Sequence, residues 1–130
     1  LQMLAKRNPT VRYLGNHWFH KGDEPNRLMT EYCMLDMPDD ECFEITNATG
    51  CFMFFRTKVF VELGGFDERF FMYLEDCDIA TRASKKYKAL FCPQVTVYHL
   101  WERESKRNYK LLMIHIKSIL KYFLKWGLKF

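Results

Sequence analysis

The sequence lacks clustered cysteines, because none of its five cysteines forms a C-x-x-C pair with another. A structural zinc site needs clustered thiolates or imidazoles, so this pattern disfavours one. The odd number of cysteines and the 48% hydrophobic content also disfavour a disulfide framework. We therefore expect reduced cysteines and a cytosolic compartment.

Basic charge is scarce in most of the chain and concentrated at its end. Residues 1–101 carry 12 Lys and Arg against 14 Asp and Glu, a balance of −2, whereas residues 102–130 carry 8 against 2, a balance of +6. A nucleic-acid-binding domain usually carries its basic patch on the folded body, so this distribution disfavours nucleic acid as a partner. A basic tail instead indicates an anionic lipid surface, an acidic partner or a solvated helix face.

The 130 residues are enough for one domain at most, and their pattern predicts an α/β fold. Residues 21–47 are polar and rich in turn formers, so we expect a loop-rich segment there. Only three short strands are indicated, which is few for a complete α/β domain. The expected strands cover residues 51–55, 89–92 and 95–100, and the expected helices cover 57–63, 75–86 and 105–125.

Three acidic residues, Glu75, Asp76 and Asp78, fall in the first turn of the helix expected over 75–86. Carboxylates at this position interact favourably with the free N–H groups and the helix dipole, which is one interpretation. The alternative is a general base, whose pKa is lowered by the helix N-terminus and raised by burial and neighbouring carboxylates. Position alone leaves both interpretations open.

An ordered set of motifs surrounds this acidic pair. The motifs are Gly50-Cys51-Phe52-Met53, Val59-Phe60, Gly64-Gly65-Phe66-Asp67-Glu68, Phe70-Phe71-Met72-Tyr73-Leu74-Glu75-Asp76-Cys77-Asp78, Arg82, Cys92-Pro93 and Val97-Tyr98-His99. The set resembles the C-terminal half of bacterial family 2 glycosyltransferases, and most closely the rhamnosyltransferase-type enzymes of surface-polysaccharide synthesis. The resemblance covers about residues 47–101.

The resemblance implies a GT-A fold, of which this chain is the C-terminal portion, with an incomplete mixed sheet and flanking helices. It also implies an inverting transfer of a sugar from a nucleotide-sugar to a saccharide or lipid-linked acceptor. Asp76 takes the place of the general base, and Glu75 orients the acceptor or caps the helix. Gly50 and Cys51 match the strand end that lines the pocket, and Asp78 is a further expected substrate contact. The spacing of Asp78 and Arg82 also predicts an i,i+4 ion pair.

The resemblance also implies a metal cofactor, Mg²⁺ or Mn²⁺. Its main ligands would lie in the family's N-terminal half, which this sequence does not contain. His99 is a candidate ligand of the metal or diphosphate, or else a solvent-facing histidine. Trp101 is a candidate stacking partner for a sugar or base, or else a core residue. The acidic run 39–41 lacks a preceding hydrophobic strand, which disfavours it as a metal site. We expect the chain to be inactive by itself.

Residues 102–130 form the second predicted unit, a basic amphipathic helix that follows the acceptor-side unit 1–101. Lysines recur every four residues from 117 to 129 and oppose a broad apolar face, and their charges disfavour a transmembrane span. One interpretation is a helix on an anionic membrane surface, which fits a lipid-linked acceptor at the inner face of the cytoplasmic membrane. The alternatives are an ordinary helix packed on its own domain or a homodimer contact.

Overall fold

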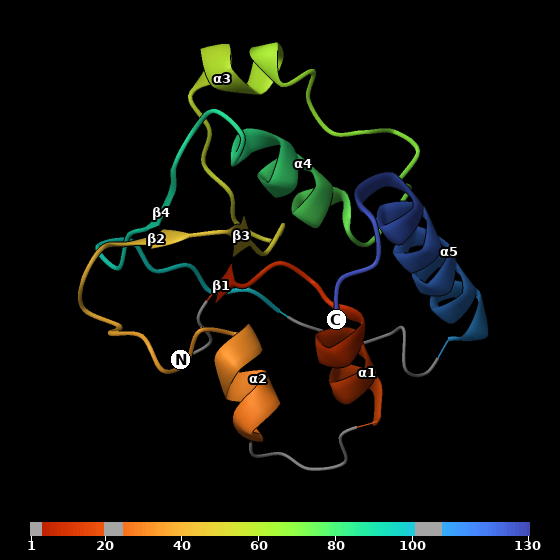
Figure 1. Cartoon of the computed structure of the whole chain (residues 1–130). Helices are drawn as coiled ribbons and strands as arrows, with labels where there is room; N and C mark the ends of the chain where they lie inside the picture. Colours follow the sequence, from red (N-terminus) through yellow and green to blue (C-terminus); the bar gives the residue numbers. More distant parts are fainter. Residues whose placement is uncertain (1–3, 20–24, 101–107) are drawn as a thin grey trace.

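The computed structural model describes residues 4–19, 25–100 and 108–130, without the side chains of residues 17 and 18. Helices and short strands alternate along this part of the chain (Figure 1). The α/β class predicted from the sequence is therefore confirmed. In chain order the elements are β1 Ala5–Lys6, α1 Val11–Phe19, α2 Arg27–Tyr32, β2 Phe43–Ile45, β3 Asn47–Ala48, α3 Thr57–Glu62, α4 Glu75–Ala83, β4 Ala89–Phe91 and α5 Tyr109–Trp126.

The strands form two separate antiparallel pairs, β1 with β3 and β2 with β4. A single residue, Thr46, separates β2 from β3, so one extended segment changes partner along its length. The expectation of one mixed sheet is therefore wrong for the described residues. Each of these strands pairs with one neighbour, over only two or three residues. No strand therefore joins the two pairs into one sheet.

Two of the three strands expected from the sequence are also absent. Residues 51–55 start in a turn and continue without regular structure, and the Phe54 side chain is 91% exposed. Residues 95–100 likewise have no strand partner, and Tyr98 is fully exposed. Apolar runs and alternation indicate surfaces suited to a sheet, but a strand also needs a neighbouring backbone for its hydrogen bonds. The third expected strand is confirmed as β4.

The helix boundaries follow local signals. α4 begins at Glu75 as predicted. Gly64 and Gly65 follow α3 and prevent the helix from continuing, with φ angles of +75° and +68°. Left-handed backbone of this kind is the conformation that glycine adopts without strain. The segment expected to be loop-rich contains α2, whose N-cap Asn26 accepts a hydrogen bond of 2.9 Å from the Met29 N–H.

The larger of two apolar cores joins α1, α4 and α5. Figure 1 shows α5 beside the beginning of α4, with α1 next to the C-terminus of the chain, which follows α5. Tyr122 and Phe123 of α5 pack in this core with the residues that precede and begin α4. Its buried members are Leu14, Phe70, Leu74, Cys77, Tyr122 and Phe123. A smaller core beneath the strands consists of Ala5, Met34 and Ile45.

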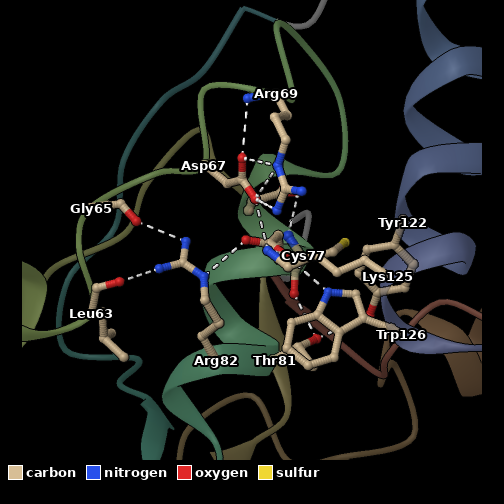
Figure 2. Close-up of polar contacts among 12 residues, drawn as sticks. Leu63, Gly65, Asp67, Arg69, Cys77, Thr81, Arg82, Tyr122, Lys125 and Trp126 are labelled. Carbon is tan, nitrogen blue, oxygen red and sulfur yellow. Dashed lines mark hydrogen bonds and ion pairs between the residues drawn. The ribbon is translucent and has the colours of Figure 1, made fainter.

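A buried carboxylate, Asp78, ties α4 to α5. Its side chain is completely buried and contacts Arg82 Nε at 2.9 Å, Lys125 Nζ at 2.6 Å and Trp126 Nε1 at 2.9 Å. Arg82 extends this network to the carbonyl oxygens of Leu63 and Gly65 (Figure 2). The predicted i,i+4 ion pair is therefore confirmed, and it belongs to a larger polar network.

Asp78→Asn is expected to lower the free energy of unfolding by about 3–5 kcal/mol, because it takes the buried carboxylate away from two mostly buried cations, of which Lys125 keeps only Asp67. Urea denaturation followed by circular dichroism measures the loss. Glu44→Gln, which breaks the exposed ion pair with Lys88, is the matched control and is expected to change stability little. Equal losses in the two variants would contradict a central role for Asp78.

Candidate active site

The turn at Gly50 and the beginning of α4 meet at Asp76. One carboxylate oxygen of Asp76, Oδ2, accepts a hydrogen bond of 2.8 Å from the Gly50 backbone N–H. The other, Oδ1, accepts one of 2.8 Å from the Cys77 N–H. Two of the predicted site residues, 26 positions apart in the chain, are thus in direct contact.

The absence of a side chain at residue 50 permits this contact. A Cβ atom on Gly50 would lie 3.2 Å from the Cβ of Asp76 and 3.4 Å from its Oδ2. Such a distance is tighter than most real Cβ contacts, so a larger residue would push the turn away from α4. The small residue therefore lets the backbone approach the acidic pair closely.

A buried amide keeps α4 next to β3. Asn47 in β3 is almost completely buried, and its Nδ2 donates a hydrogen bond of 2.9 Å to the Sγ of Cys77. Because β3 leads directly into the turn at Gly50, this bond sets the distance between that turn and α4. Burial raises the pKa of the Cys77 thiol well above its ordinary value, so Cys77 remains a neutral structural residue.

Glu75 is half-buried beside Asp76. Its Oε2 atom is buried and has no hydrogen-bond partner among the described residues. Burial raises the pKa of Glu75, and the neighbouring charge of Asp76 raises it further. A buried carboxylate oxygen without a hydrogen-bond partner is costly to ionise, which agrees with the raised pKa of Glu75.

The backbone before α4 has an unusual conformation that sequence reasoning did not find. Tyr73 and Leu74 both have left-handed backbone, with φ angles of 69° and 65°. Contacts with α5 hold this segment. The Tyr73 ring stacks on His115 at 4.4 Å between centroids, and Ser118 Oγ donates a hydrogen bond of 2.7 Å to the Met72 carbonyl. Nothing in the residue pattern signals positive φ angles at two large side chains.

Of the remaining predicted residues, Cys51 is exposed beside Gly50, at the edge of this site. Asp78 points into the protein and is fully occupied by Arg82, Lys125 and Trp126, so its position supports a structural role and not the predicted contact with substrate.

The predicted metal ligand His99 is exposed in the irregular segment after β4. Trp101 lies outside the described residues. In residues 4–19, 25–100 and 108–130, no three histidine, cysteine, aspartate or glutamate side chains lie close enough together to hold a metal ion. The described residues therefore do not fit a complete site for Mg²⁺ or Mn²⁺.

Glu75→Gln is expected to increase the free energy of unfolding at pH 7. Because burial raises the pKa of Glu75 in the folded state, its ionisation destabilises the fold as the pH rises above the ordinary value of 4.5. The glutamine variant removes this penalty, so its advantage is expected to disappear as the pH falls below that value. Urea denaturation across a pH series measures it, with Glu68→Gln as an exposed control; a pH-independent difference would contradict the assignment.

Comparison with known proteins finds relatives among bacterial rhamnosyltransferases. The chain is 32% identical over 106 residues to Rhamnosyltransferase WbbL of Escherichia coli strain K12, which covers 80% of this chain and 38% of that protein. It is 38% identical over 52 residues to N-acetylglucosaminyl-diphospho-decaprenol L-rhamnosyltransferase of Mycobacterium tuberculosis, which covers 39% of this chain and 17% of that protein. The alignments thus span well under half of either relative.

No protein-family profile matches the chain. No solved structure matches it either. The two relatives nevertheless carry the same enzyme class in their names. The resemblance to rhamnosyltransferase-type glycosyltransferases that the sequence predicts is therefore confirmed.

Proposed function

We propose that this chain forms the acceptor side of an inverting glycosyltransferase in which Asp76 is the general base. The contact between Gly50 and Asp76 is the observation that carries the proposal, because it unites two residues that the resemblance alone assigns to one site. The names of the relatives support transfer of rhamnose. We further propose that the donor is a nucleotide-sugar and that the product belongs to surface-polysaccharide synthesis, including O-antigen.

In this reaction Asp76 accepts the proton of an acceptor hydroxyl as its oxygen attacks the anomeric carbon of the donor. The new glycosidic bond forms as the bond to the nucleotide diphosphate breaks, and the diphosphate leaves with the electron pair. A carboxylate has about four acceptor positions, and the hydrogen bonds from Gly50 and Cys77 use two of them. Asp76 therefore keeps capacity for a hydroxyl while its orientation is held.

Glu75 is proposed to orient the acceptor, since it lies next to Asp76 at the beginning of α4. The acceptor is a saccharide or a lipid-linked saccharide, and the relative named for a decaprenol-linked substrate supports the second. Mg²⁺ or Mn²⁺, if the whole enzyme uses it, requires ligands beyond those described here. We place the enzyme on the inner face of the cytoplasmic membrane.

Asp76→Asn is expected to lower kcat about 10²–10⁴-fold, the usual contribution of a general base. Because the chain spans only part of its relatives, the assay uses the longest natural protein that contains this sequence, with a panel of nucleotide-sugars, Mg²⁺ or Mn²⁺ and a lipid-linked acceptor. Glu68→Gln, an exposed carboxylate in the preceding turn, is the control and should retain activity. Normal transfer by a folded Asp76→Asn enzyme would show that the acidic pair only caps α4.

A second candidate function, a membrane- or partner-binding module, is favoured by the outer face of α5. Leu120 is 58% exposed and Leu124 is 87% exposed, and the exposed Lys117 and Lys121 lie beside them on the helix. Lys125 departs from the predicted lysine stripe, because it is half-buried in ion pairs with Asp67 and Asp78. Apolar side chains bordered by lysines suit the interface of an anionic membrane. No helix in the described part of the chain is long and apolar enough to cross a membrane.

The double variant Leu120→Glu, Leu124→Glu is expected to weaken binding to phosphatidylglycerol vesicles, because it places charge where apolar groups would enter the interface. Cosedimentation measures the effect. Leu90→Glu on β4 is a matched control, since Leu90 is also 58% exposed. Equal binding by the double variant and the control would remove α5 as the membrane contact.

A further inference from the structure

The pairing of β2 with β4 places two cysteines opposite each other. Phe43 lies opposite Phe91, Glu44 opposite Leu90 and Ile45 opposite Ala89. In an antiparallel pair each step along one strand is matched by a step back along the other. The next opposed pair beyond Phe43 and Phe91 is therefore Cys42 and Cys92.

Contacts on both sides of the two cysteines maintain this register. The Phe43 and Phe91 rings pack at 5.0 Å between centroids, immediately inside the cysteine pair. Just beyond it, the Gln94 amide lies 3.4 Å from the Cys42 Sγ. Both cysteines are exposed and both are free thiols. The neighbouring Cys42 side chain raises the pKa of the Cys92 thiol.

The geometry of opposed residues suits a disulfide. Directly opposed Cα atoms in an antiparallel pair lie about 4.5 or 5.5 Å apart, depending on the type of pair. Disulfides span Cα distances of about 4.4–6.8 Å. Either type of pair thus permits the bond without a large backbone movement, and exposed disulfides are typically the labile, regulatory ones.

We propose that Cys42 and Cys92 form an oxidisable dithiol site, which a small-molecule disulfide of the glutathione class converts to a cross-strand disulfide. In the first step the Cys42 thiolate attacks one sulfur of the small disulfide, and one small thiolate leaves. Cys92 then loses its proton and attacks the Cys42 sulfur of the mixed disulfide, and the second small thiolate leaves. Two protein thiols are oxidised, and one small disulfide is reduced to two thiols.

The position of the bond gives it a structural consequence. The chain between the two cysteines contains Gly50, Glu75 and Asp76, so the disulfide encloses the whole candidate active site in one covalent loop. A loop of about 50 residues restricts the unfolded chain strongly, which stabilises the folded state. Oxidation is therefore expected to raise the midpoint temperature of unfolding. This inference stands on the strand register and is independent of the glycosyltransferase reaction.

The test treats the reduced protein with oxidised glutathione, blocks the remaining thiols with an alkylating reagent, and determines the intact mass and the linked peptides. The disulfide itself is expected to remove about 2 Da, so the alkylated product carries two alkyl groups fewer than the alkylated reduced protein. It links the peptides that contain Cys42 and Cys92, and it reverts with dithiothreitol. In Cys42→Ser and in Cys92→Ser the reaction is expected to end at a glutathione adduct on the other cysteine of the pair. Cys51→Ser, which removes an exposed thiol elsewhere, should leave the internal disulfide intact.

Two results would overturn the proposal. The first is glutathione addition to Cys42, Cys51 and Cys92 in the wild-type protein without an internal disulfide. The second is a disulfide that joins two molecules and disappears on dilution. Both cysteines are exposed, so the serine variants should fold, and circular dichroism spectra confirm that a missing bond does not arise from unfolding.

Discussion

The buried carboxylate of Asp78 is the constraint on which the arrangement of the C-terminal half depends. A carboxylate removed from water destabilises the fold unless cations and donors surround it, and here three side chains do so. Arg82 comes from the same helix, whereas Lys125 and Trp126 come from α5, so neutralising the charge requires α5 to dock. The network also reaches Asp67, whose pKa is held well below its ordinary value by Arg69 and Lys125.

This docking has consequences for the candidate site, because the same face of α5 holds the chain before α4. Two consecutive left-handed residues of ordinary type cost about 1–2 kcal/mol each, so the surrounding structure must stabilise them. Burial of Leu74, stacking of Tyr73 on His115 and the hydrogen bond from Ser118 supply that support. The direction in which α4 begins, and with it the position of Glu75 and Asp76, therefore depends on a helix more than thirty residues away in the chain.

Local signals predicted those parts of the structure that local interactions determine. Residue type and spacing predicted the acidic beginning of α4, the end of α3 at the two glycines and the short strand at 89–91. The strands expected at 51–55 and 95–100 were wrong because pairing depends on distant backbone. In the site, motif resemblance identified Gly50 and Asp76, and spacing identified the Asp78–Arg82 pair. Neither indicated that Lys125 and Trp126 complete the surroundings of Asp78, because those contacts depend on how α5 packs.

Under the proposed function, the surroundings of the acidic pair also bear on how Asp76 would accept a proton. A general base is effective where water is excluded, because its interaction with the substrate hydroxyl is then not screened. Here the neighbouring chain presents large apolar side chains to solvent, including Phe52, Phe54 and Phe71. Apolar surface next to a polar site marks a place where another surface binds. Under the proposed function, Asp76 would be the base beside this apolar surface, and the donor-binding part of the enzyme would cover it. Such an arrangement would desolvate Asp76 only when both substrates are enclosed.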